Sequence, residues 1–229
     1  SAASDVYKRQ AEQDLYAAAC GLALSGKVVC ASTFAMFAAG RAFEVIRNSI
    51  GYTGANVKIC ATHAGITVGE DGASHQTFED LALMRTIPGM TVINPCDGVS
   101  AEELLRQAIS YDGPCYIRLG RAAVPVFYQQ GADIKLGRGN WLRRGDKATV
   151  VATGIMVSEA MEAAERLAAE GIEIGVIDMH TIKPIDEEIL VEAAETGPVV
   201  TAEEHSVIGG LGGAVAEVLS RKHPVKIAM

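Results

Sequence analysis

Three short segments near the start of the chain carry residue types suited to proton transfer and ring binding. Glu12 opens an apolar helical pattern within AEQ, and Phe34 and Phe37 stand three residues apart in STFAMF. The loop at residues 62–76, THAGITVGEDGASHQ, holds two histidines and two acids. A carboxyl group can share a proton with a bound group, aromatic faces can stack on a flat ring, and histidine moves protons near neutral pH. Their combination points to a chemical site more strongly than any one of them.

Each segment also has a purely structural interpretation. Glu12 could simply stabilise the positive end of its helix. Phe34 and Phe37 could be ordinary core residues at helical spacing. His63 and His75 could be loop histidines with local partners, although histidine on a loop is often functional. Because aromatic residues make up only 5 % of the chain, two phenylalanines next to a polar loop are less expected by chance.

The elements around this loop predict how it is positioned. It follows a strand expected at Val57–Thr62, and ligands bind at the carboxyl ends of strands in open α/β sheets. Strands alternate with helices on either side, which predicts a parallel sheet covered on both faces. The other expected elements of this part are a helix at 11–25 stopped by Gly26, strand Lys27–Ser32, helix Ala35–Ser49, helix Phe78–Arg85, strand Thr91–Asn94, helix Val99–Ser110 and strand Cys115–Leu119.

The alternation of strands and helices is interrupted from Ala122 to Gly139, a segment that is expected to be a linker. It resumes after this segment. The fold prediction is therefore α/β, with two consecutive domains at residues 11–124 and 137–229, each a mostly parallel sheet flanked by helices. The second domain is expected to contain strand 148–154, helix Ile155–Glu170, strand 172–180, a helix near Asp186–Glu195, strand 198–204, helix Gly213–Leu219 and a final short strand.

Composition narrows the possible functions of the 229-residue chain. The net charge is −8 and no basic run occurs, which argues against binding to nucleic acid. No apolar stretch approaches the roughly 18 residues needed to cross a bilayer, so no membrane association is expected. The five cysteines form no CxxC pair, and several stand in apolar runs. We expect free, buried thiols in a reducing compartment, and a cytoplasmic protein.

Several segments together resemble the transketolase family. AEQ, STFAMF, THAGITVGEDGASHQ, TVINPCD and DGPCYIRLGR resemble the family's pyrimidine-binding domain. VVATGIMVSEA, VIDMHTIKPID and EEHSVIGGLGG resemble its C-terminal domain. The resemblance covers nearly everything from Ala11 to the end, and GEDGxxHQ is its most specific motif. It implies thiamine diphosphate as the cofactor.

The resemblance assigns cofactor roles to four residues. Glu12 matches the glutamate that hydrogen-bonds a nitrogen of the aminopyrimidine ring and favours the imino tautomer, which then removes the thiazolium proton to form the ylid. Phe37 matches the aromatic residue that stacks on the pyrimidine, and Phe34 lines the same pocket. His75 matches a histidine near the amino group of the cofactor.

The resemblance also assigns substrate roles. His63 matches a histidine that contacts the donor sugar, and Asp71 matches the acid that reads a substrate hydroxyl. Arg121 matches the arginine that holds the substrate phosphate, a role that suits its planar fork of donors. Arg118, on the preceding strand, is a secondary candidate.

The chain departs from the family pattern at two positions in the pocket. Gly40 stands where the family usually has an aromatic residue, three positions after Phe37. Ala64 follows His63 where many full-length transketolases carry an acid. Both departures fit split or related members and leave the identity of the sugar open.

The family's metal motif is missing from the chain. Transketolases hold the diphosphate through a divalent ion bound by a GDG motif and a later asparagine, and oxygen ligands of this kind suit Mg²⁺. We therefore expect no metal ligands here, and Mg²⁺ (or Ca²⁺) held by an N-terminal transketolase subunit as partner. The alternative is a fragment of a longer chain. The foreign-looking residues 1–10 and a strand cut short at Met229 favour some truncation at both ends.

The leading hypothesis is ketol transfer between phosphorylated sugars by the small subunit of a split, multimeric transketolase. Two other enzymes remain open, 1-deoxy-xylulose-5-phosphate synthase and the beta subunit of a 2-oxo acid dehydrogenase complex. The histidine pair and the GEDG loop favour sugar chemistry. A non-enzyme alternative is an inert assembly domain. In the second domain, His180, His205 and Glu204 are expected to serve turn capping and subunit packing.

Overall fold

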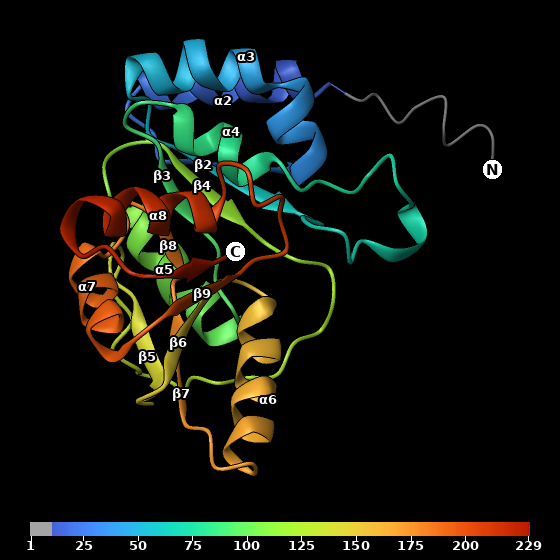
Figure 1. The fold of residues 1–229 in the computed structure, drawn as a ribbon. Helices are drawn as coiled ribbons and strands as arrows, with labels where there is room; N and C mark the ends of the chain where they lie inside the picture. The colour runs from blue at the N-terminus through green and yellow to red at the C-terminus, as the bar shows by residue number, and fades with distance from the viewer. Residues whose placement is uncertain (1–10) are drawn as a thin grey trace.

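The computed structural model describes residues 11–229, and the foreign-looking segment 1–10 lies outside the described residues. Two α/β domains follow one another along the chain and pack together (Figure 1). Each contains a five-stranded, mostly parallel sheet with helices against it, as the sequence predicts. Within the described part of the chain, no helix is long and apolar enough to cross a membrane.

The first sheet has the order β1-β2-β4-β3-β8. Four of its strands are parallel and carry apolar side chains on both faces of the sheet. They are β1 (Val29–Phe34), β2 (Val57–Thr62), β4 (Cys115–Arg118) and β3 (Thr91–Ile93). Ile59 and Tyr116 lie in one hydrophobic core, and Ile93 and Ile117 lie in another, so both faces of the sheet are covered. The carboxyl ends of β1 and β2 lie side by side, because Phe34 is in register with Thr62.

The helices of the first domain differ from the predicted ones mainly after β1. Helix α2 (Glu12–Leu24) begins at Glu12. The helix expected at 35–49 is instead a series of short turns: π-helical η1 (Phe37–Arg41), α3 (Phe43–Val45) and π-helical η2 (Ile46–Gly51). A single 3₁₀ turn, η3 (Gly69–Asp71), lies in the loop after β2, which projects from the body in Figure 1. Helices α4 (Asp80–Thr86) and α5 (Gly98–Ser110) complete this domain.

The second sheet has the order β10-β9-β6-β7-β5. Four strands are parallel, and β5 runs antiparallel to β7. The strands are β5 (Asn140–Arg143), β6 (Ala148–Ala152), β7 (Ile174–Asp178), β9 (Val199–Ala202) and β10 (Ile227–Ala228), and the helices are α6 (Met156–Ala168), α7 (Glu187–Thr196) and α8 (Leu211–Lys222).

One strand of the second half joins the sheet of the first domain. Strand β8 (Thr181–Lys183) pairs antiparallel with β3, where Val92 meets Lys183. The Lys183 ammonium then donates to the carbonyls of Arg85 and Ile87 at 2.8 and 2.6 Å. Backbone pairing and these side-chain bonds therefore attach the second domain to the first.

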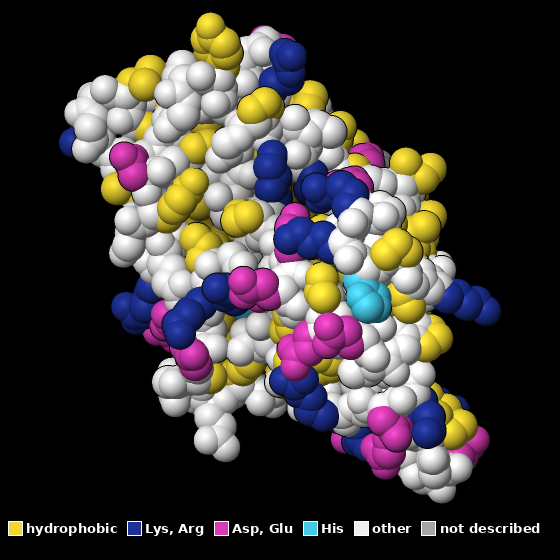
Figure 2. Space-filling view, turned by 60° about the vertical axis from the view of Figure 1, so that its left-hand side comes forward, with side chains coloured by type: hydrophobic (Ala, Val, Ile, Leu, Met, Phe, Trp, Pro, Cys, Tyr) yellow, Lys and Arg dark blue, Asp and Glu magenta, His cyan; other side chains and the backbone are white. Residues whose placement is uncertain are grey.

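The cysteines are free, but they are not all buried as the sequence predicts. Cys20, Cys96 and Cys115 are buried, Cys60 is half-buried and Cys30 is exposed. The exposed Cys30 lies on β1, which is at the edge of its sheet. On the face shown in Figure 2, acidic and basic side chains are interspersed, and the arginines and lysines form no continuous patch.

Candidate active site

Glu12 lies at the first turn of α2 with its side chain almost enclosed. The residue is 6 % exposed, and its Oε2 accepts a hydrogen bond from Arg41 Nη1 at 3.1 Å. The positive end of a helix also stabilises a carboxylate. Among residues 11–229, this buried carboxyl group has one cationic partner, Arg41.

Phe34 and Phe37 lie beyond the core and form part of a wall. Phe34 ends β1 and Phe37 begins η1, so the turn between them brings the rings together. The rings stack with centroids 6.1 Å apart and planes inclined by 14°. Both residues are half-buried. Their aromatic surface is thus partly accessible, which differs from the structural interpretation as plain core.

The two loop histidines converge on this aromatic pair. The His63 ring stacks on Phe34 with a centroid distance of 3.9 Å, and the His75 ring meets Phe37 edge-on at 5.2 Å. His63 has a φ of 57°, an uncommon conformation for a residue with a side chain. Backbone strain of this kind clusters at functional sites. The structure therefore brings together all four ring residues that the sequence predicted. We call Phe34, Phe37, His63 and His75 the ring cluster.

Local hydroxyls orient both imidazoles. Nδ1 of His63 lies 3.0 Å from Thr62 Oγ1, and Nδ1 of His75 lies 2.9 Å from Ser74 Oγ. Within residues 11–229, the Nε2 atom of each ring has no hydrogen-bond partner. Each ring can therefore offer Nε2 to a bound molecule.

Asp71 lies on the same loop as the two histidines, and Arg121 contacts that loop from the segment after β4. Asp71 ends the exposed η3 turn, and its carboxylate makes no hydrogen bond or ion pair among the described residues. Arg121 donates from Nη1 to the Val68 carbonyl at 2.8 Å and lies over Gly69, where a Cβ atom would be 2.6 Å from the guanidinium. Gly69 thus allows Arg121 to pack on the loop, although Arg121 and Asp71 do not join the ring cluster itself.

Arg118 is not available to a substrate, contrary to its place as a secondary candidate. Its side chain is 3 % exposed and forms a two-point ion pair with Asp80, at 2.8 and 3.2 Å. Tyr116 donates to the same carboxylate at 2.7 Å, and Arg118 also donates to the Glu204 carbonyl at 2.9 Å. Arg118 therefore serves to hold the two domains together.

Glu204, from the second domain, fixes the loop that carries the histidines. Its Oε1 accepts from the backbone N–H groups of Ile66 and Thr67 at 2.8 and 2.6 Å. A Cβ atom on Gly65 would come within 2.1 Å of this carboxylate, so a glycine is required there. The sequence placed Glu204 in a structural role, but it gave no sign that this role crosses the domain boundary.

The other two second-domain candidates also have structural contacts. His180 is buried between Thr181 Oγ1 at 3.1 Å and Asn140 Oδ1 at 3.0 Å, and burial lowers its pKa to about 4. His205 accepts from the Ala82 N–H at 3.3 Å and lies 3.7 Å from the Glu203 carboxylate. Both histidines therefore pack elements together, as expected.

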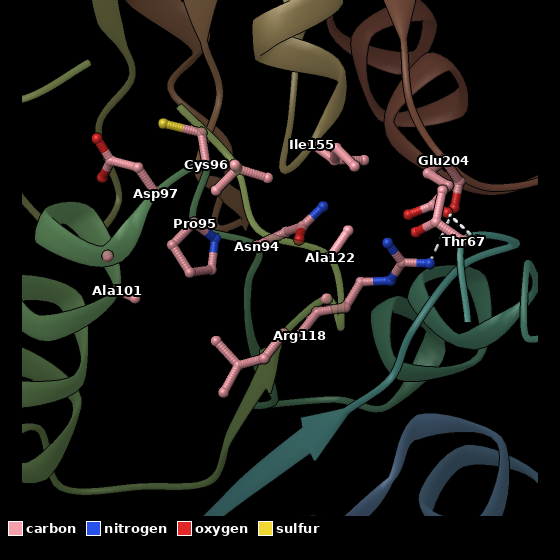
Figure 3. A pocket seen from close by; sticks show the side chains of 14 residues that line it. Thr67, Asn94, Pro95, Cys96, Asp97, Ala101, Arg118, Ala122, Ile155 and Glu204 are labelled. Carbon is pink, nitrogen blue, oxygen red and sulfur yellow. Dashed lines mark hydrogen bonds between the residues drawn. The ribbon is translucent and has the colours of Figure 1, made fainter. Parts of the chain in front are cut away.

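A separate cavity of about 180 Å³ lies where the domains meet. Figure 3 shows Asn94 near its centre, with Arg118 and Glu204 on one side and Cys96 and Asp97 on the other. The buried Asn94 Nδ2 has no hydrogen-bond partner in the part of the chain that the structure describes. None of the seven predicted site residues lines this cavity, so it is distinct from the ring cluster. Among residues 11–229, no group of three or more His, Cys, Asp or Glu side chains is placed to hold a metal ion.

Comparison with known proteins decides the family. Residues 11–126 match the family described as transketolase, pyrimidine binding domain, and residues 137–228 match transketolase, C-terminal domain. The chain belongs to the transketolase family. Membership implies dependence on thiamine diphosphate.

The relatives of this transketolase-family chain include subunits of divided enzymes. It is 51 % identical over 212 residues to a putative transketolase C-terminal section from Methanocaldococcus jannaschii, covering 92 % of this chain and 66 % of that protein. It is 44 % identical to a 6-deoxy-6-sulfo-D-fructose transketolase subunit from Clostridium sp., covering 95 % of this chain and 68 % of that protein. The chain thus spans about two thirds of the length of these relatives.

A solved structure has the same fold. It is described as a split gene transketolase, inactive beta4 tetramer, and matches with a TM-score of 0.90 and 55 % identity over 95 % of this chain and 71 % of that one.

The residues of the ring cluster fit the aminopyrimidine end of the implied cofactor. Glu12 would supply a buried carboxyl group for a ring nitrogen, and the half-buried Phe37 would supply an aromatic face. The described residues include no group of three or more His, Cys, Asp or Glu side chains that could hold the metal ion of the diphosphate.

Proposed function

We propose that this chain is the cofactor-activating half of a split transketolase that transfers ketol units between phosphorylated sugars. The observation that carries the proposal is the convergence of Phe34, Phe37, His63 and His75 beside the buried carboxyl group of Glu12. Support also comes from relatives whose names describe transketolase subunits.

Glu12, Phe37 and His75 each have a separate role toward the cofactor. Bound thiamine diphosphate supplies a thiazolium carbon that can become a nucleophile. Glu12 holds a proton at the pyrimidine ring nitrogen, in a position where little water competes for that bond. Phe37 offers the surface on which the pyrimidine packs. His75 lies at the edge of Phe37 and can use its Nε2 toward the amino group of the cofactor.

The substrate end of the site involves the loop after β2. His63 Nε2 is free to contact a hydroxyl of the donor sugar, while Thr62 holds Nδ1. Asp71, exposed further along, can accept hydrogen bonds from another hydroxyl. Arg121 has donor groups beyond the one that binds Val68, and these suit a terminal phosphate.

The second half of the site would come from a partner. We propose an N-terminal transketolase subunit that binds the diphosphate through Mg²⁺ or Ca²⁺, together with self-association of this chain. Carboxylate and carbonyl oxygens are the ligands that such a hard cation requires. This arrangement makes the isolated chain inactive.

Reconstitution tests the proposal. The chain is mixed with a subunit that carries the GDG motif and the later asparagine, and ketol transfer from xylulose 5-phosphate is measured with and without thiamine diphosphate. We expect activity only when both chains, the cofactor and Mg²⁺ are present. Activity with pyruvate alone would exclude sugar ketol transfer and favour the synthase or dehydrogenase alternatives.

The same assay can be run with a sulfonated sugar as the donor, because one relative is named for 6-deoxy-6-sulfo-D-fructose. Arg121 can bind either a sulfonate or a phosphate, since both are tetrahedral anions. Preference for the sulfonated donor would revise the proposed substrate but not the proposed ketol transfer. No transfer from either donor would exclude the proposed reaction.

A further inference from the structure

Arg41 contacts both residues to which the proposed function assigns the cofactor ring. Its Nη1 donates to Glu12 Oε2 at 3.1 Å, and its guanidinium carbon lies 5.0 Å from the centre of the Phe37 ring. These are the carboxyl group and the aromatic face that an aminopyrimidine would use. The flat guanidinium thus imitates both interactions of a flat, nitrogen-bearing ring.

The backbone explains why Arg41 reaches these positions. Phe37 and Arg41 begin and end the π-helical turn η1, in which the Ala42 N–H bonds the Phe37 carbonyl at 3.2 Å. Residues four apart on a helical turn lie on one side of it. Helix α2 packs against this turn and brings Glu12 to the same side.

Arg41 covers part of the half-buried Phe37 ring. His75 meets it edge-on at 5.2 Å, Phe34 packs at 6.1 Å and Arg41 lies over it. A pyrimidine that both stacks on Phe37 and bonds Glu12 needs the space next to these two side chains. The Arg41 guanidinium already contacts both of them.

We propose that Arg41 is a specificity-determining stand-in for the aminopyrimidine, and that it leaves Glu12 and Phe37 when the cofactor ring binds. The inference rests on the proposed function of Glu12 and Phe37. Its physical basis is an exchange of partners. Glu12 would otherwise be a buried carboxylate without a cation, which is costly, and the cofactor nitrogen replaces the bond that Arg41 gives up.

Because Arg41 is partly exposed, moving its side chain away from Glu12 costs little free energy. Its side chain is 40 % exposed, against 7 % for Glu12. An arginine at this depth can turn into water and recover its hydration, and ion pairs of such partly exposed residues are weak and sensitive to salt. Ligands that offer only an anionic tail, with no ring nitrogen for Glu12, would not replace Arg41. The contact therefore favours the ring.

The test measures thiamine diphosphate binding to the reconstituted complex by titration calorimetry. If Arg41 competes with the ring, R41A should bind the cofactor about 5- to 30-fold more tightly than the natural chain, as expected from losing a partly exposed ion pair and a cation–π contact. R41K should lie between the two, because its compact, strongly hydrated charge leaves more readily. R47A is the matched control, since Arg47 is exposed and, within the described residues, its side chain bonds only its neighbour Asn48.

Salt gives a second readout that a purely structural role would not affect. The difference in affinity between the natural chain and R41A should shrink as ionic strength rises, because salt screens the Arg41–Glu12 pair in the free complex. Equal or weaker cofactor binding by R41A and R41K, with melting temperatures like that of R47A, would overturn the role of Arg41 and leave the proposed function intact. Absence of binding in every chain, the natural one included, would overturn both.

Discussion

The His63 imidazole lies parallel to the Phe34 ring, with centroids 3.9 Å apart and planes inclined by 13°. His63 ends up there because Phe34 and Thr62 are in register at the carboxyl ends of β1 and β2. The positive φ of His63 then turns the chain away from the sheet. Two residues that are far apart in sequence thus form one wall of the site through strand pairing.

This stacking predicts how a change at Phe34 affects the substrate end of the site. F34A should leave the His63 ring without its support and raise the KM for the donor sugar about tenfold, with a smaller effect on kcat, because positioning affects substrate binding first. F34Y should stay near the natural chain. Steady-state kinetics of the reconstituted enzyme measure this. An unchanged KM in F34A would show that the stacking has no part in substrate binding.

Glu12 should matter for chemistry more than for folding. E12Q keeps the size of the side chain and an oxygen for Arg41, but it cannot exchange a proton. We expect kcat of the reconstituted enzyme to fall by about 10²-fold or more, as for loss of a general acid–base group. The melting temperature should change little. A fully active E12Q would favour the interpretation of this chain as an inert assembly domain.

Glu204 should control the order of the histidine loop from the opposite domain. In E204A, the backbone N–H groups of Ile66 and Thr67 lose a charged acceptor, at a cost of about 1.5 to 3 kcal/mol in the free energy of unfolding. Amide hydrogen exchange at Ile66 and Thr67 should quicken. The exposed Glu162, changed to alanine, is the control. Protection of both amides in E204A as strong as in the natural chain would contradict this role.

Local patterns in the sequence were sufficient to predict the two α/β domains. Strand β2 is predicted residue for residue, because its apolar run is bounded by polar loops. Strands β5 and β8 were missed since each is antiparallel and short, and β8 gains its partner only when the two domains pack. The helix after β1 was expected to be regular, and no periodicity in residues 35–51 distinguishes its π-helical turns from α-helix.

The family motifs mark residues that the structure places close together, while the roles of these residues stay predictions. Phe34, Phe37, His63 and His75 come together as expected. Arg41 was missed because it lies outside the motifs that resemble the family, and its partner Glu12 is 29 positions away. The structural use of Arg118 was also hidden, since its partner Asp80 lies on a helix whose packing the sequence does not specify.

The buried carboxyl group of Asp178 should make the stability of the chain depend on pH. Burial raises its pKa from 3.8 to about 7, while Tyr128 donates to its Oδ2 at 2.9 Å. Between these two values the folded chain keeps a proton that the unfolded chain has lost. Stability from this group is therefore full below about pH 4 and declines toward pH 7, by about 1.4 kcal/mol per pH unit at most.

Two variants isolate this effect. D178N keeps the shape and has no proton to lose, so the free energy of unfolding of the natural chain relative to D178N should fall as the pH rises from 5 to 7. Urea unfolding at several pH values measures it, with the exposed D133N as control. His180 works in the opposite direction, because burial lowers its pKa from 6.5 to about 4 and its stability is lost as pH falls through that range. Since His180 is the same in both chains, its contribution cancels in the comparison with D178N, and parallel pH profiles for the two chains would show that Asp178 is already ionised in the folded state.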